Sequence, residues 1–171
     1  MRSDVITRLL LELVDRHGEG DVSVTKCPES LLPKLDALEV SRDLKRLFRF
    51  DWLDKCLWLE MGVSIDGLSA ILASKDLPPL LKHGIVPIGN AANGDLLVLR
   101  VVPPDLCEVG FVAHEELRGS EDSFEPAKGY ARATKSLDAF LFRHVDRLYL
   151  PSDFYECEQW VELQREMGTD I

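Results

Sequence analysis

The chain has 171 residues, of which 46% are hydrophobic and 29% charged, with 20 basic residues against 30 acidic ones. This composition is typical of a globular domain and excludes a collagen-like, coiled-coil or largely disordered chain, so we expect one domain over residues 1–171. The net charge of −10 argues against a nucleic-acid partner and against attraction to anionic membranes, and it favours a basic partner.

The first predicted helix begins at Ser3 as a cap, has apolar residues at spacings of three and four, and stops at Gly18. Charged residues surround its leucine run at 9–11, so the sequence predicts neither a signal peptide nor a membrane span there. We therefore expect a cytoplasmic protein. A short edge strand is expected at 22–25, and a loop follows it.

Two further helices are predicted before the middle of the chain. The first follows Ser41 and has an apolar side and a basic side. The basic side consists of Arg42, Lys45, Arg46 and Arg49. The second is expected to have Ser64 as its cap and to end at Pro78 and Pro79, because proline disfavours continuation of a helix.

The middle of the chain is predicted to form the sheet. Its three runs rich in leucine and β-branched residues lie at 85–88, 96–102 and 109–113. Asn93-Gly94 predicts a tight turn between the first two runs, since both residues tolerate positive φ. Pro87 cannot donate to a ladder, so the first run should be an edge strand or carry a bulge. The second run is apolar on both faces, which is typical of a central strand.

The last predicted elements are a strand at 130–133 and two helices. Ser136 is expected to cap the first of these helices, which has an apolar face from Leu137 to Leu148. After Pro151, Ser152 is expected to cap the second. The buried side of this last helix is expected to carry Phe154, Cys157, Trp160 and Val161.

Candidate chemical groups are few, because no common catalytic motif occurs in the sequence. One cluster with the residue types of a metal or acid/base site consists of Asp95, His114, Glu115 and Glu116. Adjacent residues point in different directions, which favours a solvent-exposed strand end over an active site. His17 and His144 are interpreted as structural, and His83 has no evident partner.

The four cysteines are widely separated, without a C-x-x-C pair. They are Cys27, Cys56, Cys107 and Cys157. This spacing favours buried, reduced thiols over a disulfide framework or a zinc site. We therefore predict no metal.

An acidic stripe is predicted on the last helix, where Glu158, Glu162 and Glu166 recur at i,i+4 spacing and repel one another. Simple solvation would account for this stripe. It could also face the basic side of the Ser41 helix, or bind a cationic partner protein. The remaining surplus of acidic residues is concentrated in the segment 114–125.

The stretch 77–99, with the letters LPPLLKHGIVPIGNAANGDLLVL, resembles the core signature of the SUKH superfamily. This group includes fungal cell-wall synthesis regulators and many bacterial immunity proteins. The motif residues are Pro87, Gly89, Asn93, Gly94 and Asp95. Downstream, 109–116 resembles the family's next strand and 131–141 its following helix. The resemblance covers about residues 60–145, with the N-terminal helix and the acidic C-terminal helix as additions.

This resemblance implies an α+β fold, with a mixed or mainly antiparallel sheet flanked by helices. It also implies protein binding without catalysis or a cofactor. Many members neutralise toxins, so the chain is expected to be a non-enzymatic immunity protein that binds a basic toxin, whose cationic groove an acidic protein can occlude. The predicted partner-binding residues are Asp95, Glu115, Glu116, Glu121, Asp122, Glu125, Glu158, Glu162 and Glu166.

Two other functions stay open at this point. An acidic secretion chaperone would hold an exported protein with its leucine-rich first helix and acidic last helix, and it would form a stable dimer. An enzyme would need Asp95, His114 and Glu116 in one cleft. The sequence does not fix the oligomeric state.

Overall fold

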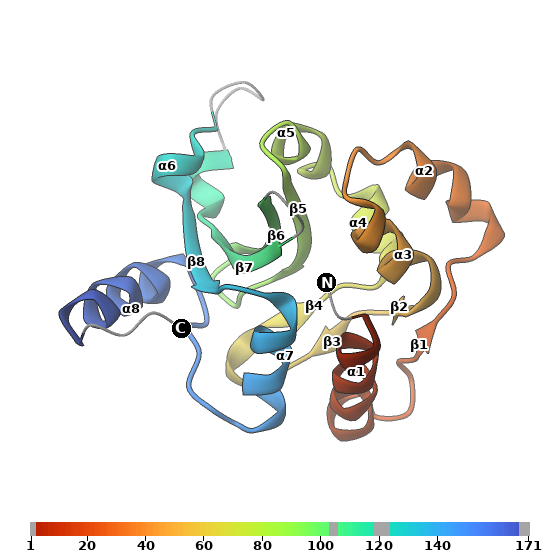
Figure 1. Ribbon diagram of the computed structural model, residues 1–171, viewed down its shortest axis with the longest axis horizontal. Helices are drawn as coiled ribbons and strands as arrows, with labels where there is room; N and C mark the ends of the chain where they lie inside the picture. Colours follow the sequence, from red (N-terminus) through yellow and green to blue (C-terminus); the bar gives the residue numbers. More distant parts are fainter. Residues whose placement is uncertain (1–2, 103–105, 118–123, 168–171) are drawn as a thin grey trace.

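A six-stranded antiparallel sheet forms the centre of the molecule, and its strands follow one another in chain order (Figure 1). The structure is a computed structural model that describes residues 3–102, 106–117 and 124–167. The strands are β3 (Leu57–Trp58), β4 (Ser64–Ile65), β5 (Ile85–Asn90), β6 (Leu96–Val102), β7 (Leu106–Val112) and β8 (Tyr130–Thr134). A separate antiparallel pair joins β1 (Val24–Thr25) to β2 (Trp52–Leu53). The predicted α+β class with a mainly antiparallel sheet in one domain is confirmed.

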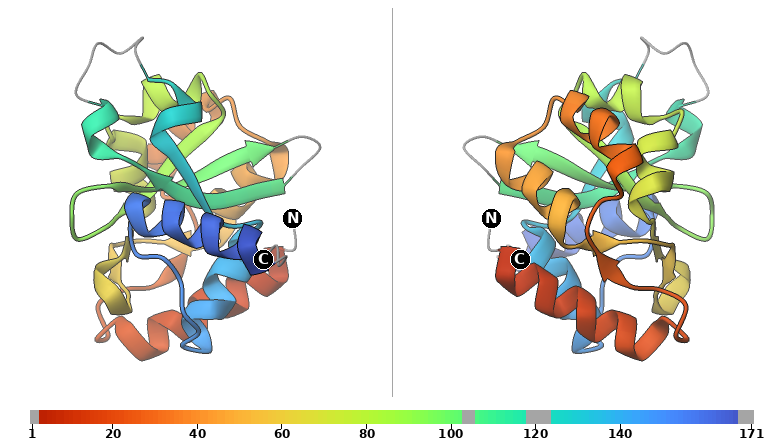
Figure 2. Two further views of the ribbon diagram at one scale, coloured as in Figure 1. Left: turned by 90° about the vertical axis from the view of Figure 1, so that its left-hand side faces the viewer. Right: turned by 90° about the vertical axis from the view of Figure 1, so that its right-hand side faces the viewer.

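Helices surround this sheet on several sides (Figure 2). They are α1 (Ser3–His17), α2 (Leu32–Ala37), α3 (Arg42–Phe50), α4 (Leu68–Ala73), α5 (Leu77–Leu81), α6 (Pro126–Gly129), α7 (Leu137–Val145) and α8 (Phe154–Met167). Short 3₁₀ turns are η1 (Glu29–Leu31), η2 (Glu60–Gly62) and η3 (His114–Leu117). Helix α1 packs on α7, whereas α8 contacts β7 and β8 at the other side of the molecule from α2 and α3.

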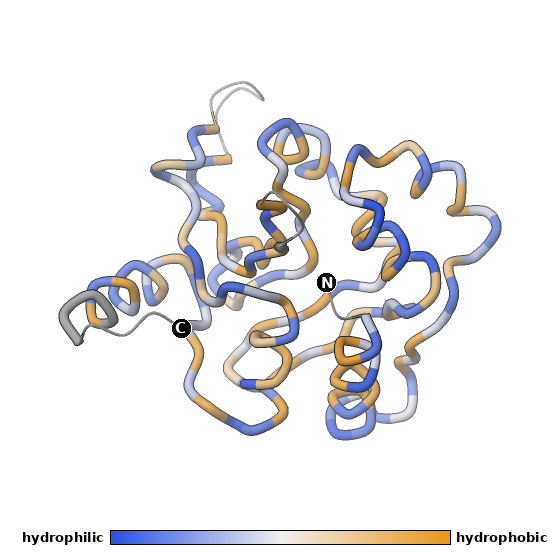
Figure 3. The backbone as a smooth tube through the Cα atoms, in the orientation of Figure 1, coloured by the Kyte–Doolittle hydropathy of each residue, from blue (hydrophilic) through white to orange (hydrophobic). Residues whose placement is uncertain are grey.

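The strongly periodic helices form as predicted. In α1 the residues on the buried side are Ile6, Leu9, Leu10 and Leu13. Hydrophobic and hydrophilic residues alternate along its turns in Figure 3. The predicted caps of two other helices are also confirmed, because the Ser41 hydroxyl accepts a hydrogen bond from the Leu44 N–H of α3, and the Ser136 hydroxyl accepts one from the Ala139 N–H of α7. These caps depend on local sequence alone.

Two predictions between residues 64 and 81 are wrong. Ser64 does not cap a helix but lies in β4, and α4 begins four residues later. Pro78 and Pro79 do not end a helix but lie in the first turn of α5. The first turn has no intrahelical acceptors for its N–H groups, so proline there loses no hydrogen bond.

The predicted ends of the last two helices also need correction. The predicted cap Ser152 is off by one residue, because the Asp153 carboxylate accepts the Glu156 N–H at 2.9 Å. Ser152 instead donates its own N–H to the Glu156 carboxylate. Leu148 lies beyond the end of α7 and is exposed, so it does not belong to the buried face of that helix.

Strand β5 lies inside the sheet, between β4 and β6, and this decides between the two expectations for Pro87. The edge-strand alternative is wrong, whereas the bulge is confirmed, because the register shifts between Pro87 and Gly89. A Cβ added at Gly89 would lie only 1.8 Å from the Ser64 carbonyl oxygen. Glycine is therefore required where β5 passes closest to β4.

The sheet buries both of its faces at β6, as the apolar run predicts. Leu97 and Leu99 point into the main core, which includes α1 and α7. Val98 points to the opposite face, where a second buried cluster contains Leu80 and Phe124. Arg100 follows on the same side as Val98 and is the charged residue of this strand.

The cysteines are free thiols. Cys107 and Cys157 are buried, as predicted, and Cys27 is half-buried. Cys56 is exposed in the short loop between β2 and β3, so the prediction of a buried thiol is wrong there. Among the described residues, no helix combines the length and the apolar character that crossing a membrane requires.

The turn between β5 and β6 gives a first testable prediction. Gly94 has a φ of +95° and donates its N–H to the Ala91 carbonyl at 3.0 Å. Gly94→Ala should lower the free energy of unfolding by about 1 kcal/mol, because a Cβ disfavours positive φ even though there is room for it here. Urea denaturation measures this change, and a stability equal to that of the wild type would contradict the requirement for positive φ.

Candidate functional site

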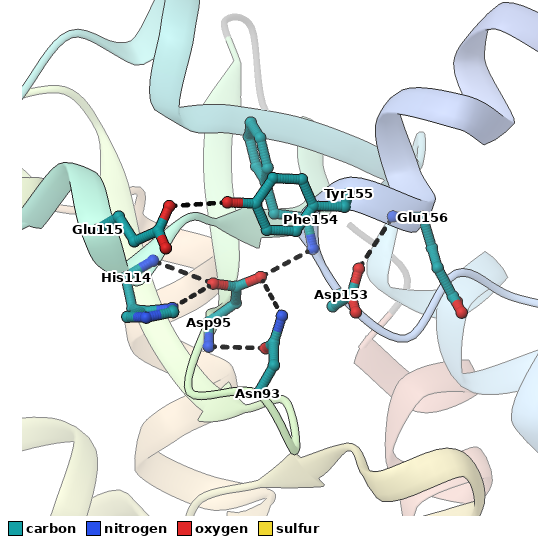
Figure 4. A network of polar contacts seen from close by, with 8 residues as sticks. All are labelled: Asn93, Asp95, His114, Glu115, Asp153, Phe154, Tyr155 and Glu156. Carbon is teal, nitrogen blue, oxygen red and sulfur yellow. Dashed lines mark hydrogen bonds and ion pairs between the residues drawn. The ribbon is translucent and has the colours of Figure 1, made fainter.

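The carboxylate of Asp95 joins three segments of the chain beside β6 (Figure 4). One oxygen accepts the His114 backbone N–H at 3.0 Å and lies 2.8 Å from the His114 Nδ1 atom. The other oxygen accepts a hydrogen bond from the Asn93 side-chain amide at 2.8 Å and one from the Phe154 backbone N–H at 3.1 Å. The β5–β6 turn, η3 and the N-terminus of α8 therefore meet at one side chain.

Asp95 has no exposed surface. Burial favours its neutral form, but hydrogen bonds from His114, Asn93 and Phe154 outweigh burial and hold the pKa of Asp95 below its ordinary value. A side chain without exposed surface cannot touch a partner, which corrects the prediction that Asp95 is a partner-binding residue. Its hydrogen bonds instead connect the start of α8 and η3 to the β5–β6 turn.

The candidate acid/base cluster is only partly assembled. Asp95 and His114 are in contact, and the His114 side chain is 28% exposed, so this histidine is not simply a solvated residue at a strand end. Glu116 is exposed and packs beside Gly129 of α6. Within the described residues, no hydrogen bond joins Glu116 to Asp95 or His114. The structure thus forms an Asp95–His114 pair and not the larger cluster that an acid/base site would need.

An acidic surface lies where η3 meets α8. The Tyr155 hydroxyl of α8 donates a hydrogen bond to the Glu115 carboxylate of η3 at 2.7 Å, and the Tyr155 side chain is itself exposed. Glu158 and Glu162 follow Tyr155 by about one and two helical turns on the same side of α8, and both are exposed. We call Glu115, Tyr155, Glu158 and Glu162 the α8 acidic face.

A groove of about 700 Å³ lies between α8 and the sheet. Its helix wall carries Tyr155, Glu158 and Glu162, and its floor carries Arg100, Glu108 and Arg132 from β6, β7 and β8.

The floor of the groove is an interconnected polar network. Arg132 forms an ion pair with Glu108 at 3.3 Å, and the Tyr130 hydroxyl donates to Glu108 at 3.4 Å. The Arg100 guanidinium lies 5.0 Å from the centre of the Tyr130 ring, as in a cation–π contact. Burial, together with the nearby Glu108 carboxylate, raises the pKa of Tyr130, which stays neutral.

The structure describes only some of the other predicted partner-binding residues. Glu125 forms an exposed ion pair with Lys128 of α6 at 2.7 Å. Glu121, Asp122 and the side chain of Glu166 lie outside the described residues. His83, for which the sequence shows no partner, packs edge-on against the Phe124 ring.

The acidic stripe of α8 does not face the basic side of α3. Arg49 forms an ion pair with Asp36 of α2, and Lys45 donates to the Asp36 carbonyl, at the opposite side of the molecule from α8 (Figure 1). The arginines that line the groove with α8 come instead from the sheet. One sequence signal pointed to them, since Arg100 interrupts an otherwise apolar strand.

Comparison with protein-family models, with curated proteins and with solved structures finds no match to this chain. Functional inference therefore depends on the α8 acidic face, the groove and the Asp95 network.

Proposed function

We propose that the chain is a non-enzymatic protein-binding module of SUKH type, an immunity protein that binds and neutralises a basic toxin domain in the cytoplasm. The observation that carries this proposal is the α8 acidic face, where three exposed carboxylates surround an exposed tyrosine. Tyrosine is enriched in protein interfaces, and complementary charge increases the rate of association. The net charge of −10 adds a long-range attraction for a basic partner.

Hydrogen bonds hold the α8 acidic face in place, and this favours binding. Asp95 fixes the N-terminus of α8 through the Phe154 N–H, and the Tyr155–Glu115 hydrogen bond fixes the next residue. A surface held in place before binding loses less conformational entropy when the complex forms. The same contacts occupy both oxygens of the Asp95 carboxylate, which favours a positioning role over general acid/base catalysis.

A photo-crosslinking experiment tests this function. p-Benzoylphenylalanine is placed at Tyr155 on the α8 acidic face and, as a control, at the exposed Phe50 of α3 on the other side of the molecule. We expect position 155 to capture a basic protein in cells of the source organism, and position 50 to capture none. The captured protein is then expressed alone and together with the immunity protein.

Growth should be inhibited by the captured protein alone and restored by the wild-type chain. A variant with Glu158→Lys and Glu162→Lys should bind the captured protein at least 10-fold more weakly and fail to restore growth. A captured protein that is acidic, or that the wild-type chain does not neutralise, would overturn the proposal. Folding of the variant is verified by circular dichroism.

A further inference from the structure

The groove beside α8 has the size of a ligand site, because its volume of about 700 Å³ lies within the range of roughly 300–1,000 Å³ that such sites occupy. It is polar, and it differs in this from the apolar pockets that take most small molecules. Carboxylates line it on two sides, with Glu108 on the sheet and Glu158 and Glu162 on the helix.

The two helix carboxylates lie across the groove from Arg100 and Arg132, and the groove is lined by three acidic and two basic side chains. Among the described residues, the side chains of Glu158 and Glu162 form neither an ion pair nor a hydrogen bond. They are four residues apart, and like charges at this spacing destabilise a helix by a few tenths of a kcal/mol. A cation bound between them would remove this repulsion.

The floor of the same groove already shows how a guanidinium is held. Arg132 is paired with the carboxylate of Glu108, and Arg100 lies over the ring of Tyr130. The helix wall of the groove also offers an aromatic ring and carboxylates, since Tyr155 is 45% exposed beside Glu158 and Glu162. A guanidinium can stack on an aromatic ring and pair with a carboxylate at once, whereas the compact, strongly hydrated ammonium group of lysine does so less well.

We infer that the groove between α8 and β8 receives an arginine side chain of the partner, stacked near Tyr155 and paired with Glu158 and Glu162. This inference rests on the proposed function and names the chemistry of the partner at that site. An anionic group is disfavoured beside Tyr155, because it would face Glu158 and Glu162 on the helix wall, whereas the arginines of the groove lie on the sheet.

The test uses three synthetic peptides, Ac-GRGRGRG-NH₂, Ac-GKGKGKG-NH₂ and Ac-GEGEGEG-NH₂, measured by isothermal titration calorimetry at 150 mM salt. Wild-type protein should bind the arginine peptide at least fivefold more tightly than the lysine peptide, and it should not bind the glutamate peptide. Equal affinity for arginine and lysine peptides, or no binding of either, would overturn the inference.

Two variants and a control locate the binding. Ala127→Trp fills the groove at an exposed position without changing any charge, and Glu158→Gln with Glu162→Gln removes the helix carboxylates. Each should weaken binding of the arginine peptide at least 10-fold. The control, Glu29→Gln with Glu39→Gln, makes the same charge change at exposed positions and should alter affinity less than twofold. An equal loss in the control would show general charge attraction only and would overturn the inference.

The protein captured by crosslinking distinguishes this inference from the proposed function. If Ala127→Trp leaves its binding unchanged while the Glu158→Lys and Glu162→Lys variant loses it, the protein-binding function stands and the arginine site in the groove is wrong. If the arginine peptide binds in the groove but no toxin is captured, the site stands and the immunity function is wrong.

Discussion

Replacing Asp95 by alanine is expected to lower the free energy of unfolding by about 4 kcal/mol. The carboxylate is fully buried and accepts hydrogen bonds from the backbone N–H groups of His114 and Phe154 and from the Asn93 amide. A buried donor that loses its acceptor costs about 1–3 kcal/mol, so several such losses together account for the expected effect. Urea denaturation measures it.

The variant Asp95→Asn separates loss of charge from loss of volume. The NH₂ of asparagine would face N–H donors at one of the two oxygen positions, so we expect the free energy of unfolding to fall by about 2–3 kcal/mol. Hydrogen exchange should accelerate first at the amides of Phe154 and Glu156, because α8 loses its attachment. The control is Asp21→Ala, at an exposed position, which should change stability by less than about 0.5 kcal/mol. A stable Asp95→Ala protein with unchanged exchange in α8 would refute the positioning role.

The second large effect is a loss of stability at low pH, which we expect to depend on His144. Burial, helped by the neighbouring His17 charge, lowers the pKa of His144 to about 4, while Glu60 opposes this shift. Its Nε2 atom is buried without a hydrogen-bond partner in the described residues, and its ring packs edge-on against Phe140 at 4.7 Å. The neutral ring is therefore the form that fits the folded protein.

The sign of the effect follows from the two pKa values of His144. The pKa of about 4 in the folded protein lies below the unfolded value of about 6.5. The contribution of the neutral His144 ring to the free energy of unfolding is therefore fully present above pH 6.5 and is lost as the pH falls towards 4. The expected loss is about 3 kcal/mol. Stability is measured by urea denaturation at pH 7, 5.5 and 4.5.

His144→Gln cannot be protonated and should remove this dependence on pH, whereas the control His83→Gln should keep it. An unchanged slope in His144→Gln would contradict the prediction. The contribution of Asp95 falls in a different pH window. Because its pKa is lowered on folding, its stabilisation is lost only as the pH falls below the unfolded value of about 3.9.

The features that the sequence predicted correctly are those set by neighbouring residues. Ser41 and Ser136 cap their helices because the bond joins residues three apart, and the strands β5 to β7 follow from their apolar runs. The errors arose where one local signal permits two structures. Proline can follow a helix or begin one, and Pro78 and Pro79 do the second.

The site was less predictable, because it depends on residues that are distant in the chain. The buried Asp95 carboxylate accepts hydrogen bonds from His114 and from Phe154, which is 59 residues away in the chain. An aspartate after an Asn-Gly turn is normally exposed, so the sequence placed it on the surface. The groove likewise brings Arg100, Glu108 and Arg132 from three strands opposite α8, and the strand register that does this is not encoded in any short motif.

The order of the strands has a consequence for the kinetics of folding. Each strand from β3 to β8 pairs with the strand next to it in the chain, so the sheet can grow one neighbouring strand at a time. Helices α4 and α5 lie between β4 and β5, and η3 and α6 lie between β7 and β8, so these two pairings close longer loops. Helix α1 is different, because its packing partner α7 lies more than a hundred residues later, and Arg16 of α1 donates a hydrogen bond to the Val145 carbonyl. Helix α1 is synthesised well before α7 and is thus expected to dock late, and its apolar side stays available to chaperones until α7 has formed.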